Sequence, residues 1–62
     1  MIKRADIERH LRQHGCTKAR EGGKHSVWQG PTGSRSTVPR HREIPRGTAR
    51  SICDQLGIPR LT

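Results

Sequence analysis

The chain has 62 residues, of which 27% are hydrophobic, and 13 Lys and Arg against 5 Asp and Glu give a formal net charge of +8. This length predicts one small domain, residues 1–62, with no room for the deep pocket that a large cofactor needs. The sequence lacks the run of about 20 apolar residues of a membrane span and the apolar region of a secretory signal. We therefore expect a cytoplasmic protein with no membrane partner and no small-molecule cofactor.

The first predicted element is a helix over residues 4–14. Ile7 and Leu11 are one helical repeat apart, and Gly15 is a suitable residue to end the helix. The short stretch 16–20 follows and is predicted to be a strand.

Two more strands are predicted at residues 24–29 and 35–39. Val and Trp favour the first of them, and the Gly and Pro residues of 30–33 predict a hairpin turn between the two. Pro39 indicates that the last strand ends there or lies at a sheet edge.

A second helix is predicted after the basic loop 40–46, where four apolar residues recur with helical spacing. They are Ala49, Ile52, Cys53 and Leu56. Gly47 or Thr48 is expected to cap the start of this helix. Gly57 is expected to end it, with Ile58 folding back onto its last turn.

This order predicts an α+β fold, α-β-β-β-α, in which both helices cover one face of a three-stranded antiparallel sheet. The expected helical side of the core comprises Ile7, Leu11, Ile52, Cys53, Leu56 and Ile58. Cys16 and Cys53 are predicted to be buried free thiols, because a protein with no secretory signal is kept in a reducing compartment. No metal site is predicted, since the only helical pair of possible ligands, His10 and His14, is better explained as a polar helix surface.

The positive charge predicts a polyanionic partner, and nucleic acid is favoured over a membrane surface. Ten of the 13 cations are Arg, whose planar fork suits phosphate. A membrane-surface helix needs a broad apolar face that no segment here offers.

The best candidate for chemistry is the run Gly22-Gly23-Lys24-His25. Two glycines allow the backbone to approach an anion closely, Lys24 adds a positive charge, and a histidine exchanges protons near physiological pH. A simple hairpin turn followed by a polar strand residue explains the same four residues.

Trp28 is the only aromatic residue and has two possible roles. Strand alternation places Trp28 and Val27 on opposite faces. If Val27 faces the helices, Trp28 is free to stack on a base. We favour a place in the core, because the chain has little else to fill space.

Five segments follow one another in a characteristic order: Gly23-Lys24-His25, Gly30-Pro31-Thr32-Gly33-Ser34-Arg35, Thr37-Val38-Pro39, the run Ile44 to Ile52, and Gly57-Ile58. With these segments the chain resembles, over residues 3–58, the HicA-type toxins, the small mRNA interferases of HicA–HicB toxin–antitoxin modules. The resemblance implies a fold like a double-stranded-RNA-binding domain, mRNA cleavage without a metal, His25 as the catalytic residue and a HicB-type antitoxin as partner. Lys24 departs from the small residue usual in the family.

On this resemblance we expect His25 to act as general base or general acid, while Lys24 and the N–H groups around the two glycines stabilise phosphate charge. The predicted RNA-binding residues are Gly22, Gly23, Lys24, Trp28, Arg35, Arg40, Arg42 and Arg46. A non-catalytic double-stranded-RNA-binding module is the alternative function, and a structural protein of a ribonucleoprotein particle is a third.

Overall fold

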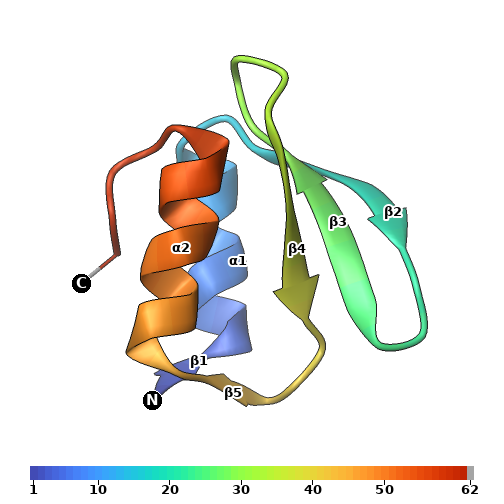
Figure 1. Cartoon of the computed structure of the whole chain (residues 1–62), viewed down its shortest axis with the longest axis vertical. Helices are drawn as coiled ribbons and strands as arrows, with labels where there is room; N and C mark the ends of the chain where they lie inside the picture. The colour runs from blue at the N-terminus through green and yellow to red at the C-terminus, as the bar shows by residue number, and fades with distance from the viewer. Residues whose placement is uncertain (62) are drawn as a thin grey trace.

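Two helices form where the apolar spacing predicts them. In the computed structural model, which describes residues 1–61, α1 spans Arg4–Gln13 and α2 spans Arg46–Leu56 (Figure 1). Thr62, the last residue of the predicted domain, lies outside the described residues. Within residues 1–61, no helix is long and apolar enough to span a membrane.

Both helices end as predicted, at a glycine with left-handed backbone. Gly15 has φ 81° and Gly57 has φ 70°, a conformation that costs glycine little. After Gly57, the Ile58 N–H donates to the Cys53 carbonyl at 3.1 Å, and the Ile58 side chain is buried. This is the Schellman arrangement, which ties the chain back onto the helix it has just left.

The start of α2 differs from the prediction. The helix begins one residue before Gly47, and Pro45 occupies the N-cap position in place of Gly47 or Thr48. Within residues 1–61, no side chain donates or accepts a capping hydrogen bond there. Pro45 succeeds because its fixed φ is compatible with a helix start and its missing N–H is not needed there.

The three predicted strands form one antiparallel sheet in the order β2-β3-β4. They span Thr17–Glu21, His25–Gln29 and Arg35–Pro39, so the first lies one residue later than predicted. The α+β class, the two helices and the three-stranded antiparallel sheet are thus confirmed. The likeness to a double-stranded-RNA-binding domain stays a prediction.

A second, two-stranded sheet was not predicted. β1 (Ile2–Lys3) precedes α1 and pairs antiparallel with β5 (Glu43–Ile44), which lies inside the basic loop. Ile44 is fully buried and Ile2 packs against the core. The basic loop is therefore not free chain, because the β1–β5 pair ties it to the start of α1 (Figure 1).

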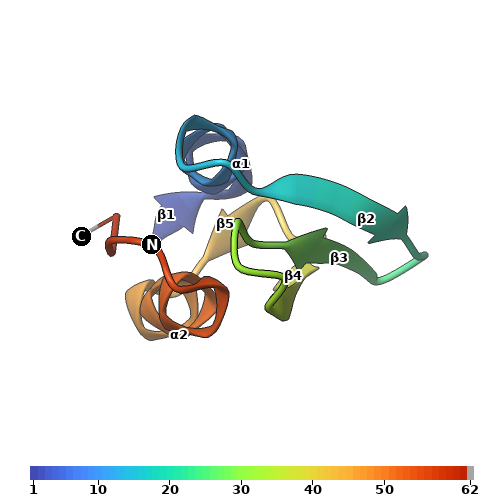
Figure 2. The ribbon, with the colours of Figure 1, turned by 90° about the horizontal axis from the view of Figure 1, so that it is seen from above.

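One face of the three-stranded sheet is buried. Trp28 and Val38 have no exposed surface, and their cross-strand partners Ser36 and Ser26 are also buried. Figure 2 shows both helices on the same side of this sheet. Val27 is only partly buried on the opposite face, so the interpretation of Trp28 as a core residue is confirmed and base stacking by Trp28 is wrong.

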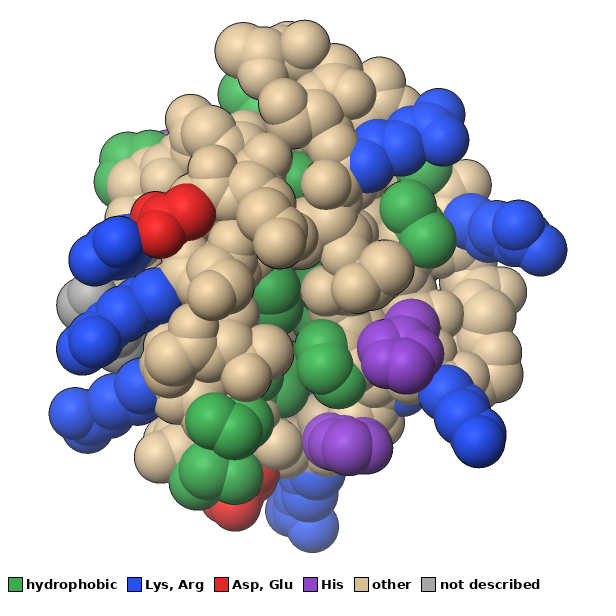
Figure 3. Space-filling view, in the orientation of Figure 1, with side chains coloured by type: hydrophobic (Ala, Val, Ile, Leu, Met, Phe, Trp, Pro, Cys, Tyr) green, Lys and Arg blue, Asp and Glu red, His purple; other side chains and the backbone are tan. Residues whose placement is uncertain are grey.

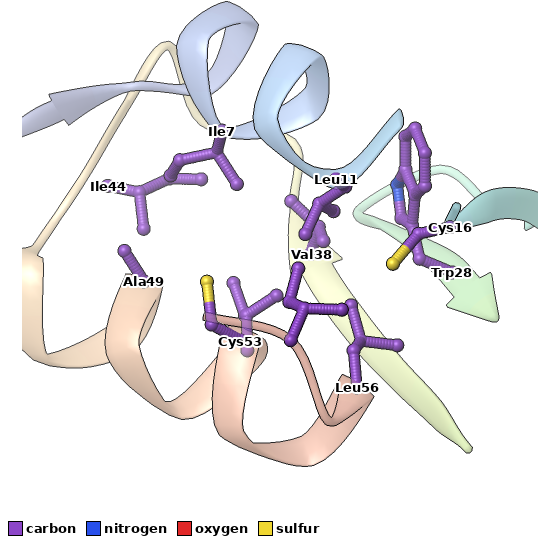
Figure 4. Close-up of a cluster of buried hydrophobic side chains, with 11 residues drawn as sticks. Ile7, Leu11, Cys16, Trp28, Val38, Ile44, Ala49, Cys53 and Leu56 are labelled. Atoms are coloured by element: carbon purple, nitrogen blue, oxygen red, sulfur yellow. The ribbon is translucent and has the colours of Figure 1, made fainter. Parts of the chain in front are cut away.

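The helices supply the rest of the core, as predicted. The buried cluster joins Ile7, Leu11, Cys16, Trp28, Val38, Ile44, Ala49, Ile52, Cys53, Leu56 and Ile58. Figure 4 shows Trp28 and Cys16 at one end of it and Ile44 with Ala49 at the other. Both cysteines are free and buried, and burial, followed by the influence of Cys53, raises the pKa of the Cys16 thiol.

Gly30 lies where β3 leaves the sheet and passes α2. A Cβ added there would lie 2.5 Å from the Leu56 carbonyl oxygen, which is backbone and cannot move aside. We expect Gly30→Ala to lower the free energy of unfolding by about 1–3 kcal/mol through overpacking, measured by urea denaturation. Gly47→Ala is the control, because a Cβ on Gly47 meets no atom within 4 Å. Equal midpoints for both variants would contradict the close approach.

Candidate functional site

The turn between β2 and β3 brings Gly22, Gly23, Lys24 and His25 to the surface. The Gly22 N–H donates to the His25 carbonyl at 2.9 Å, which closes the turn. A Cβ on Gly22 would lie 3.0 Å from that same oxygen, so the turn is tight enough to favour glycine. The Gly22 N–H is therefore engaged within the turn, and its contact with phosphate stays a prediction.

His25 is the first residue of β3 and its side chain is exposed. It pairs across the sheet with Pro39, the last residue of β4. The imidazole therefore lies at one end of the open sheet face, where a polymer can reach it without entering a pocket.

Arg40 fastens the end of β4 to this turn. Its N–H donates to the Lys24 carbonyl at 3.0 Å, and its Nη1 donates to the Gly22 carbonyl at 3.0 Å. Its Nη2 lies 3.6 Å from Glu21 Oε1. The Arg40 guanidinium is thus held at the turn by the Gly22 carbonyl and Glu21.

Arg20 was missed by the sequence analysis. Lys18 pairs with Trp28 and Arg20 pairs with Val27, so Ala19 is an extra residue that forms a β-bulge. Without the bulge Arg20 would oppose Ser26 on the buried face. The bulge places Arg20 on the open face as a diagonal neighbour of His25, within reach of a long side chain.

The remaining predicted residues do not all gather at the turn. Arg35 is at the opposite end of the open face, because it pairs with Gln29 and His25 pairs with Pro39. Arg42 is exposed just before β5, and Arg46 is the exposed first residue of α2. The structure therefore groups Lys24, His25 and Arg40 and leaves Arg35 apart.

Four acidic residues pair with basic ones, and the chain keeps a net charge of +8. Asp6, Glu8, Glu21 and Asp54 each lie no more than 3.9 Å from an Arg or Lys nitrogen. The Asp54–Arg60 pair is bidentate, and its hydrogen bonds hold the pKa of the Asp54 carboxyl below its usual range. Figure 3 shows Lys and Arg side chains around the edge of the molecule, with histidines among them and few acidic groups.

His10 and His14 are neighbours on α1, with ring centroids 4.5 Å apart. His10 Nε2 lies 2.7 Å from the Pro59 carbonyl oxygen, so the ring joins α1 to the segment after α2. In residues 1–61, no group of three or more His, Cys, Asp or Glu side chains is close enough to hold a metal ion. The position of His10 is thus explained by its contact with the Pro59 carbonyl.

Comparison with known proteins gives one match. The family model described as the HicA toxin of bacterial toxin–antitoxin matches residues 4–58, which is most of the chain. No curated protein and no solved structure matches. The matched range contains the whole β2–β3 turn, the basic loop and both helices.

Proposed function

The chain belongs to the HicA toxin family of toxin–antitoxin systems, and from this premise we propose that it is an endoribonuclease that cleaves mRNA. The observation that carries the proposal is the exposed His25 at a glycine turn, with the Arg40 guanidinium fixed at the same turn. Lys24 adds a cation directly before His25 in the chain, and both residues are exposed. An RNA backbone can reach such a surface although the domain is too small for a deep pocket.

The proposed reaction is attack of a ribose 2′-OH on the adjacent phosphorus. The O2′–P bond forms, the P–O5′ bond breaks, and the products end in a 2′,3′-cyclic phosphate and a 5′-hydroxyl. His25 either accepts the proton of the 2′-OH or donates a proton to the departing 5′-oxygen. Water or a second group performs the other transfer, so protons and electrons balance without an oxidant or a metal.

Charge stabilisation is proposed for three side chains around His25. Lys24 precedes it in the turn, Arg40 is anchored beside the turn, and Arg20 lies diagonally across the open face. A fixed cation lowers the energy of a phosphorane that gains negative charge in the transition state. We assign the backbone hydrogen bond to phosphate to the Gly23 N–H, because the Gly22 N–H already donates to the His25 carbonyl.

The proposed protein partner is a HicB-type antitoxin with an acidic surface. A partner that covers the β2–β3 turn neutralises the cations and blocks His25 in one contact. Opposite charges also speed such an encounter at low salt.

The experiment is incubation of the purified chain with a single-stranded RNA oligonucleotide in excess EDTA. We expect cleavage to continue after chelation, with products that carry a 2′,3′-cyclic phosphate and a 5′-hydroxyl when analysed by mass spectrometry. RNA with a 2′-deoxy substitution at the cleaved position is the control and should stay intact. Binding of double-stranded RNA without any cut would support the non-catalytic module instead, and products with 5′-phosphates would refute the 2′-OH route.

A further inference from the structure

A cavity of about 250 Å³ lies between the start of α1 and the basic loop. It is lined by Lys3, Arg4, Ala5, Arg40 and Arg42, so four of its five lining residues are cationic. Lys3 and Arg4 were not among the predicted RNA-binding residues. The cavity is separate from the β2–β3 turn, although Arg40 lines the cavity and also contacts the turn.

The cavity is built by backbone contacts rather than by flexible side chains alone. The Arg4 N–H donates to the Arg42 carbonyl at 2.9 Å, and Arg4 Nη1 donates to the Arg40 carbonyl at 2.9 Å. The β1–β5 pair, in which Lys3 lies opposite Glu43, holds the same two segments together at the residue before Arg4. These contacts place the four cationic residues around one hollow.

The lining fits a phosphate better than any other ligand class. In the described part of the chain it includes no acidic and no aromatic residue, and Ala5 is its one apolar member. The nearby acids do not line it, although Glu8 Oε2 is 3.9 Å from Arg4 Nε and Glu21 Oε1 is 3.6 Å from Arg40 Nη2. Glu43 pairs with Lys3 through the strand backbone. Arg forks suit phosphate oxygens, and the N-terminal turn of α1, which includes Ala5, favours an anion.

We propose that this cavity binds a backbone phosphate of the RNA, next along the strand to the phosphate cut at His25. This rests on the proposed function. Arg40 connects the two places, because it lines the cavity and its guanidinium donates to the Gly22 carbonyl of the turn that presents His25. On this proposal a strand that lies across His25 continues past the turn to the cavity, and a phosphate seated there fixes which bond meets the imidazole.

The test measures RNA affinity in a His25→Ala background, where the oligonucleotide stays uncut. Arg42→Gln is the test variant and Arg50→Gln is the matched control, because both arginines are exposed and each change removes one charge. We expect Arg42→Gln to weaken binding about tenfold at low salt, as loss of a charged hydrogen bond does. The slope of log K against log salt should fall by about 0.7, the value for one phosphate contact on a single strand. Lys3→Gln should act in the same direction, and Arg50→Gln should change affinity far less.

A second arm identifies the source of the phosphate. Inorganic phosphate is titrated into the labelled protein, and we expect amide shifts at Arg4, Ala5 and Arg42 that the RNA oligonucleotide competes away. Phosphate-induced shifts with no RNA competition would overturn the assignment to the RNA backbone. A weaker complex of Arg42→Gln with an acidic protein, while RNA affinity is kept, would overturn it too.

The outcomes separate this proposal from the proposed function. If the unmodified chain cuts RNA but Arg42→Gln and Arg50→Gln bind equally, the cavity proposal is overturned and the function stands. If the unmodified chain binds RNA but never cuts it, and Arg42→Gln but not Arg50→Gln lowers the salt slope, the cavity proposal is supported and the proposed cleavage fails.

Discussion

Replacement of His25 by alanine should lower the rate of RNA cleavage by about 10²–10⁴-fold, the usual contribution of one general acid or base. The fold should be unaffected, because the His25 side chain is exposed and its carbonyl, which accepts from Gly22, is kept in the variant. The loss should therefore appear in kcat, while RNA affinity stays nearly constant. The measurement is single-turnover cleavage of a labelled oligonucleotide beside a binding titration.

His14→Ala is the matched control for this experiment. It also removes one imidazole, but from α1, where His14 packs beside His10 away from the β2–β3 turn. Cleavage by the His14 variant should equal that of the unmodified chain. Undiminished cleavage by His25→Ala would show that the proton is moved by another group, and the proposed mechanism would be wrong.

Trp28→Ala should unfold much of the protein. Removal of a buried Trp typically costs about 3–5 kcal/mol, whereas a chain of this length has a total stability of about 3–9 kcal/mol. Trp28 has no exposed surface, and Arg12 and Lys18 lie over its ring, 5.2 and 5.7 Å from the centroid. The expected result is loss of the cooperative urea transition, which circular dichroism measures.

Two variants control the Trp28 experiment. Val27→Ala alters the adjacent residue on the open face and should cost less than about 1 kcal/mol. Trp28→Phe keeps most of the ring volume and removes the indole Nε1, which has no hydrogen-bond partner among the described residues. It should therefore be milder than the alanine variant. A stably folded Trp28→Ala protein with weakened RNA binding would restore the stacking role.

The elements were predictable because their signals are local. A helix needs only apolar residues at helical spacing and a glycine stop, and Leu11 with Gly15 or Leu56 with Gly57 provide both within one turn. The buried face of each helix follows from the same spacing. Hairpin turns at Gly22–Gly23 and Gly30–Gly33 are local signals as well.

Features that depend on distant residues were not predictable. Residues 2–3 and 43–44 are too few to show alternation, and their pairing exists only because the helices bring them together. The bulge at Ala19, which turns Arg20 outward, is a matter of register rather than composition. The sequence also left the orientation of Trp28 open, because strand alternation separates two faces without saying which one is covered.

The candidate site also has a part that local sequence predicts and a part that only folding brings together. His25 and its glycines are contiguous, so the motif and the family resemblance pointed to them. The cationic cavity joins Lys3 and Arg4 to Arg40 and Arg42, which are distant in the sequence. Each of these residues alone resembles an ordinary surface cation, and only the folded chain makes them one site.

The β1–β5 pair has a consequence for the order in which the nascent chain folds. Its strands come from residues 2–3 and 43–44, and the core that covers Leu11 also needs Leu56 and Ile58. Because a ribosome delivers the chain from its N-terminus, the first forty residues emerge with neither their partner strand nor half of their core. Such a fragment has too little apolar surface to bury to stay folded. The β2–β3 turn and the basic loop therefore reach their folded arrangement only after the residues of α2 have left the ribosome.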